Sequence, residues 1–169
     1  MNLLKKLYDM RDKKKADNKG FSLVELIIVI AIMAILVGIV GTQVIPYIEK
    51  SRKAKDTQIL SGLCTDANTA YGSTAAKLDA TATYEIKITA AAGAAGASGI
   101  AVTGGAAAEQ TALKNAFTEL NGINGLADLK LASKDGKAVT QVIITCSDTG
   151  VKVEAKDATS DKFDPIESK

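Results

Sequence analysis

The sequence contains no histidine and only two cysteines, Cys64 and Cys146. Without histidine, the Ser–His and Cys–His pairs that activate a nucleophile are excluded. Most zinc sites are excluded as well, because two thiolates alone do not complete a tetrahedral shell. A Gly-Lys-Ser/Thr sequence, which a phosphate-binding loop needs, is also absent. These absences argue against an enzyme and give no reason to expect a cofactor or a metal.

One short motif has to be weighed against that interpretation. Asp148-Thr149-Gly150 matches the signature of aspartic proteases, in which two such loops bring two carboxylates together. The sequence has a single copy, and the same residue types are common in hairpin turns. We therefore interpret residues 147–150 as a turn.

Charged residues are missing from residues 26–48, a run of 23 mostly aliphatic residues. As a helix this run is about 34 Å long, enough to cross a hydrocarbon core of about 30 Å. Seven basic and three acidic residues precede Phe21, a net charge of +4 that leaves −2 for the rest. The basic segment predicts a cytoplasmic N-terminus with the remainder delivered outside. Nothing in the charge distribution indicates a nucleic-acid partner.

Glu25 is the one carboxylate within this apolar region. A charge there costs on the order of several kcal/mol unless it is neutralised or paired, and no cation lies at the neighbouring helical positions. Cleavage between Gly20 and Phe21 would create an α-amino group about 6 Å along the helix axis from Glu25. This amine is able to pair with Glu25 of its own chain. Alternatively, it pairs with Glu25 of an adjacent identical helix and so sets the axial stagger.

Residues 19–26, Lys-Gly-Phe-Ser-Leu-Val-Glu-Leu, followed by a long aliphatic helix, resemble the class III signal of type IV pilins and pseudopilins. The overall pattern resembles that of clostridial major pilins. The resemblance covers about the first quarter of the chain. It implies cleavage after Gly20 by a membrane peptidase, N-methylation of Phe21, and a role for Glu25 as the assembly carboxylate.

By this resemblance we expect a structural protein, the major pilin of a type IV pilus. The implied partners are identical subunits in a helical filament, the prepilin peptidase and methylase, and an assembly platform with its ATPase. The precursor is expected in the cytoplasmic membrane and the filament at the cell surface. The alternatives are a type II secretion or competence pseudopilin and a membrane-anchored binding module.

Three residues within the apolar helix have specific expected effects. Gly38 and Gly41 lack side chains and would allow neighbouring helices to approach closely. Pro46 removes one backbone donor and predicts a kink.

Beyond the apolar run, the helix is predicted to continue as an amphipathic half over residues 49–71. Its apolar stripe recurs with helical period at Ile59, Leu60, Leu63, Cys64, Ala67, Ala70 and Tyr71, and Gly72 is expected to end it. Residues 21–71 would form about 76 Å of helix, which a domain of about 100 residues does not cover. Lipid would therefore cover the apolar half before assembly, and sister subunits after it.

The remaining residues predict a small head. We expect a strand at residues 83–88, a surface loop over the Ala/Gly-rich residues 90–108 and a helix over residues 109–120. A three-stranded antiparallel meander would follow, with strands near residues 129–131, 139–146 and 151–155 and an Asp135-Gly136 turn. Phe163 and Ile166 are expected to anchor the polar C-terminal tail.

The predicted fold is thus α+β, with a long N-terminal helix, half membrane-spanning and half amphipathic, packed on a small antiparallel sheet. Residues 1–20 form the leader, 21–48 the assembly helix, 49–71 the amphipathic half and 72–169 the head. Cys64 lies on the apolar stripe of the helix and Cys146 has the same parity as Val142 and Ile144, so both are expected to point into the seam between helix and sheet. They predict either a disulfide, which would contribute about 4 kcal/mol by loop closure, or two buried thiols.

Overall fold

The computed structural model describes residues 21–91 and 98–168. Helix α2 (Leu23–Thr74) runs without interruption through Pro46 and is followed by the short 3-10 helix η1 (Ala75–Lys77). The chain divides into two compact units between Pro46 and Tyr47. The predicted leader, residues 1–20, lies outside the described residues.

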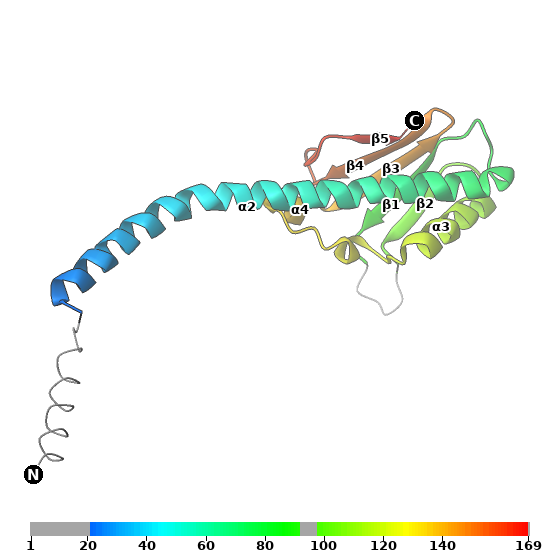
Figure 1. Cartoon of the computed structure of the whole chain (residues 1–169). Coiled ribbons are helices and arrows are strands. Elements are labelled where there is room, and N and C mark those ends of the chain that lie inside the picture. Colours follow the sequence, from blue (N-terminus) through cyan, green and yellow to red (C-terminus); the bar gives the residue numbers. More distant parts are fainter. Residues whose placement is uncertain (1–20, 92–97, 169) are drawn as a thin grey trace, which may run out of the picture. The chain divides into compact units, whose positions relative to one another are not determined.

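The unit that begins at Tyr47 contains a five-stranded antiparallel sheet (Figure 1). Its strands lie in the order β2-β1-β3-β4-β5. They are β1 (Tyr84–Thr89), β2 (Ile100–Thr103), β3 (Gln141–Ser147), β4 (Gly150–Lys156) and β5 (Ile166–Ser168). Apolar side chains alternate along β1, β3 and β4, so one face of the sheet is buried.

Helix α2 packs its amphipathic half on this buried face. Leu60, Leu63, Cys64, Ala67 and Ala70 are all buried, and the flanking Ile59 and Tyr71 are partly buried against the same core. Helix α3 (Ala107–Asn121), which lies beside β2 in Figure 1, adds Leu113 and Phe117. This arrangement confirms the predicted α+β class.

Several predicted boundaries agree with the structure. The expected strands near residues 83–88, 139–146 and 151–155 correspond to β1, β3 and β4. Residues 147–150 form the turn between β3 and β4. The predicted helix at residues 109–120 is α3, which ends at Gly122 in the left-handed conformation. Phe163 is buried and Ile166 packs against the core, so both anchor the C-terminal tail.

The Ala/Gly-rich segment is more ordered than predicted. Residues 92–97 lie outside the described residues, but Ile100–Thr103 forms strand β2 instead of continuing a loop. Ile100 and Val102 alternate and pair with Ile88 and Ile86 of β1, which buries both side chains. A strand of four residues is too short to be recognised beside a low-complexity stretch.

The prediction for residues 129–136 was wrong. Leu129 ends the 3-10 helix η2 (Leu126–Leu129) instead of starting a strand, and Asp135-Gly136 lies in the short helix α4 (Lys134–Ala138). The stop at Gly72 was also misplaced, because α2 continues to Thr74, whose hydroxyl donates to the carbonyl of Ala70 at 2.7 Å.

The segment before α4 folds differently because its backbone binds to α2. The amides of Ala132 and Ser133 each donate to the Asp56 carboxylate at 2.9 Å, and the Ser133 hydroxyl donates to it at 2.5 Å. Asp56 is completely buried. A buried carboxylate is tolerated when several donors satisfy it. The amides that a third meander strand would have used are therefore committed to Asp56.

Gly136 completes this buried site. A side chain at Gly136 would collide with the Asp56 carboxylate and with Leu131. Asp56 has no room to move away, because three donors hold it in place. The glycine is thus required for close packing against α2, and not for a hairpin turn as the sequence pattern had indicated.

We predict that Asp56→Asn destabilises the head by about 2–4 kcal/mol. The NH₂ group of the asparagine would face one of the three donors that bind the Asp56 carboxylate, and that donor would lose its acceptor. Burial alone would raise the pKa of Asp56, but its hydrogen bonds with Ser133 and Ala132 outweigh burial and lower it. Its contribution is therefore present above the pKa of the unfolded chain, about 3.9, and is lost as the pH falls below that value. Thermal unfolding of the detergent-solubilised chain between pH 3 and pH 7 measures this.

The matched control is Asp148→Asn, which changes an exposed aspartate in the β3–β4 turn. It should unfold as the wild type does at every pH. A stability difference for Asp56→Asn that persists undiminished at pH 3 would contradict the role assigned to the Asp56 carboxylate.

Candidate processing and assembly site

The predicted processing site is only partly within the described residues. Gly20 lies outside them, whereas Phe21 is the first described residue and is 87% exposed. Phe21 and Ser22 precede α2, which begins at Leu23. The helical estimate of 6 Å between the future amine and Glu25 therefore does not apply, because Phe21 is not part of the helix.

Glu25 caps the helix that follows Phe21. The Ser22 amide donates to Oε2 of Glu25 at 2.9 Å, and the Val24 amide donates to the Ser22 hydroxyl at 3.4 Å. The first helical hydrogen bond joins the Leu26 amide to the Ser22 carbonyl at 3.1 Å. Ser22 and Glu25 thus form a capping box, in which a serine and a glutamate three residues later satisfy the free amides of the first turn.

The capping box is a functional feature that the sequence analysis missed, although Ser-x-x-Glu before an apolar run is its usual signature. It supplies a local reason for a carboxylate at this position. The positive end of the helix dipole is a second favourable interaction. Glu25 has no ion-pair partner within residues 21–91 and 98–168.

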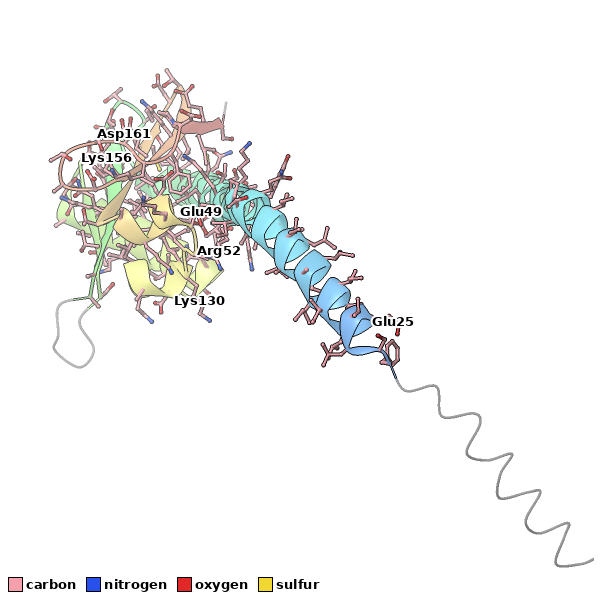
Figure 2. All side chains as sticks on the ribbon, turned by 90° about the vertical axis from the view of Figure 1, so that its left-hand side faces the viewer. Glu25, Glu49, Arg52, Lys130, Lys156 and Asp161 are labelled. Atoms are coloured by element: carbon pink, nitrogen blue, oxygen red, sulfur yellow. The ribbon has the colours of Figure 1, made fainter. Side chains whose placement is uncertain are left out.

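The capping contact leaves part of the carboxylate free. A carboxylate accepts about four hydrogen bonds, and the described contact uses one lone pair of Oε2. Figure 2 shows Glu25 in the first turn of α2. The Phe21 nitrogen is one residue from the Ser22 amide that already contacts Glu25. An amine created at Phe21 therefore begins close to a carboxylate with unused acceptors.

The helix between this cap and Pro46 is exposed along its whole length. None of residues 21–46 is buried, and the apolar side chains around the whole circumference are exposed, from Leu23 and Val24 to Val44 and Ile45. A β-carbon placed on Gly38 or Gly41 would meet no other atom within 4 Å. Within residues 21–46, nothing packs against these two glycines.

The same segment is long and apolar enough to cross a membrane. Its most apolar 18-residue window has a mean hydropathy of 3.2, and no residue in that window is buried. Pro46 lies at the end of this segment inside the continuous helix α2. A membrane tolerates helices because they satisfy their own backbone hydrogen bonds.

Cys64 and Cys146 lie in the core of the head, as the sequence analysis placed them. Both are free thiols and both are buried. The Cys64 sulfur donates to the Val151 carbonyl at 3.7 Å, and Val151 is the cross-strand partner of Cys146. Burial, with a smaller effect from Cys64, raises the pKa of Cys146 to about 12, and burial also raises the pKa of Cys64.

Comparison with protein families identifies one segment of the chain. Residues 15–41 match the prokaryotic N-terminal methylation motif. The chain has no significant match among curated proteins. It has no significant match among solved structures either.

The matched residues include Gly20, Phe21, Ser22 and Glu25, so the family match and the capped helix end coincide. In this N-methylation motif the chain is similar to type IV pilins and pseudopilins. The motif implies processing by a prepilin peptidase and pilus-type assembly. A long helix packed on an antiparallel sheet is the pilin-like architecture expected with that signal.

We predict that neither cysteine reacts quickly with a thiol reagent in the folded protein, because reaction requires a thiolate. At pH 8 a thiol of pKa about 12 is ionised in about one molecule in ten thousand. After unfolding without a reductant, mass spectrometry should find two labels per chain. A chain that accepts labels only after reduction would carry the Cys64–Cys146 disulfide instead.

Proposed function

We propose that this protein is the major structural subunit of a type IV pilus. The observation that carries the proposal is an apolar helix that contains part of the methylation motif and whose described residues 21–46 are all exposed. Exposed apolar surface of this extent requires lipid or other protein around it. A membrane before assembly and identical subunits afterwards meet that requirement in turn.

The proposed maturation begins at the leader. The prepilin peptidase cleaves the peptide bond between Gly20 and Phe21, and the new amine of Phe21 is methylated. An assembly platform and its ATPase then add the mature subunit to a surface filament. The basic residues before Gly20 keep the N-terminus of the precursor in the cytoplasm.

The proposed role of Glu25 in assembly is to pair with the Phe21 amine. In the capped helix, one oxygen of Glu25 receives the Ser22 amide and the carboxylate retains acceptors for a cation. Pairing with the amine of a neighbouring subunit would compensate two charges in an apolar environment, and only one axial register achieves this. Pairing within the chain would compensate the charges without fixing the register.

A pseudopilin is the second candidate, because the methylation motif over residues 15–41 is common to both classes. A major pilin is the chief component of long, abundant surface fibres. A pseudopilin forms short filaments within the secretion or uptake machinery. Electron microscopy of sheared surface material, with identification of this chain in the fibres, distinguishes the two.

Processing is tested by the mass of the mature chain. We expect the N-terminal peptide from native membranes or fibres to begin at Phe21 and to be one methyl group heavier than its unmodified form. Gly20→Ala has a methyl group at the cleaved bond and serves as the comparison, with unprocessed precursor expected to accumulate. A wild-type chain that retains residues 1–20 in its fibres would contradict the proposal.

Assembly is tested by separating the charge of Glu25 from its capping role. Glu25→Gln retains a capping-box acceptor but has no charge, and we expect it to reduce fibre yield at least about tenfold. Ser22→Ala removes the hydroxyl cap and leaves the charge, and we expect fibres close to wild-type yield. Fibre yield is measured by immunoblotting of sheared filaments against total membrane-inserted chain.

The opposite pattern, with normal fibres from Glu25→Gln and few from Ser22→Ala, would show that Glu25 acts through the helix cap. Circular dichroism of both variants in detergent checks that the head remains folded. Normal fibres from both variants would remove Glu25 from the assembly mechanism.

A further inference from the structure

The first two turns of α2 after the apolar run contain charges of both signs. Lys50, Arg52, Lys53 and Lys55 supply four cations, and Glu49 and Asp56 supply two acids. In the sequence this is a mixed segment without an evident binding preference. The structure separates the two signs.

Both acids and one of the cations contact residues of the head. Asp56 is buried and accepts from Ala132 and Ser133, as described above. The Lys134 amide donates to Oε1 of Glu49. Lys53 forms an ion pair with Asp135 at 2.7 Å. These contacts draw both acids toward α4 and the residues before it.

The other three cations remain exposed. Lys50 and Lys55 have no carboxylate within ion-pair distance among the described residues, and Arg52 has a single contact of 3.8 Å with Glu49. By helical spacing Lys50 and Lys55 lie about 120° and 100° around the helix from Asp56 in opposite directions, so they flank the side that faces the head, and Arg52 lies about 40° from Asp56. Figure 2 shows Glu49 and Arg52 on this part of α2.

A tyrosine accompanies these cations at the end of the apolar run. Tyr47 is 71% exposed, and the Lys50 nitrogen lies 5.8 Å from the centre of its ring. Exposed tyrosine and lysine directly after an apolar span are typical of the membrane–water interface. There the ring lies among the headgroups while the ammonium reaches the phosphates.

We propose that Tyr47, Lys50, Arg52 and Lys55 form a binding surface for anionic phospholipid headgroups, here called the juxtamembrane cation surface. The four residues span about 12 Å along the helix axis, and the headgroup layer of one leaflet is about 5–8 Å thick. Helical side chains lean toward the N-terminus, here the apolar run, so the cations reach back into that layer. Charge complementarity identifies the lipid phosphate as the ligand.

This surface would hold the membrane-inserted chain at a fixed depth. It rests on the membrane stage of the proposed function but requires neither cleavage at Gly20 nor filament growth. A cation near an anionic surface contributes about a fivefold preference.

The test uses the full chain in phosphatidylcholine vesicles, with and without one-third phosphatidylglycerol. Acetylation of individual lysines is measured by mass spectrometry. We expect Lys50 and Lys55 to be protected by the anionic lipid and exposed again at about 0.5 M salt. Lys77, near the other end of the same helix, and Lys87 on β1 are exposed internal references whose labelling should not change.

The variant Lys50→Gln/Lys55→Gln tests the same surface through the lipid. The wild-type chain should restrict the motion of spin-labelled phosphatidylglycerol more than that of spin-labelled phosphatidylcholine. Each removed lysine should lower this preference about fivefold. The matched control, Lys77→Gln/Lys87→Gln, changes the net charge equally and should behave as the wild type does.

Three results would overturn the proposal. The first is an inserted chain with no preference for anionic lipid, and the second is an equal loss in both double variants. The third is protection of Lys50 and Lys55 only in assembled filaments, which would assign them to contacts with sister subunits. A chain that does not insert into vesicles would also contradict the membrane stage of the proposed function, whereas the first three results leave that stage intact.

Discussion

An α-helix satisfies its own backbone hydrogen bonds, so its side chains alone decide which surroundings it tolerates. Helix α2 uses this property to serve two environments in one continuous element. Up to Pro46 every side chain is exposed and almost all are apolar. From Leu60 onward a single stripe is buried against the sheet. The head depends on the second part for its core, and the proposed assembly depends on the first part being uncovered.

Three of the four acids of α2 accept hydrogen bonds from backbone amides outside regular structure. Glu25 accepts the Ser22 amide, Glu49 accepts the Lys134 amide, and Asp56 accepts the amides of Ala132 and Ser133. In each case a carboxylate binds backbone donors that have no partner in regular structure. Near the head, Glu49 and Asp56 therefore contact the head, whereas Lys50 and Lys55 remain exposed. The same principle gives Glu25 a structural role that is distinct from the charge pairing proposed for it.

Much of the fold could be predicted from periodic patterns. The stripe from Ile59 to Tyr71 and the alternation in β1, β3 and β4 were recognisable because each element buries one face. Strand β2 escaped prediction because only Ile100 and Val102 are buried in it, beside an Ala/Gly-rich stretch. Residues 129–136 were misassigned because their backbone binds Asp56, a contact between positions more than 70 residues apart.

The sequence by itself determined the methylation motif, the apolar span and the position of Glu25, because each of these is a local property of neighbouring residues. It also contained the Ser22–Glu25 capping box, which is local for the same reason. Only the tertiary structure decided that Asp56 is buried, that Gly136 must lack a side chain, and that Lys50 and Lys55 remain exposed. Those features depend on which backbone amides the folded head brings to α2, and local residue patterns do not encode such long-range contacts.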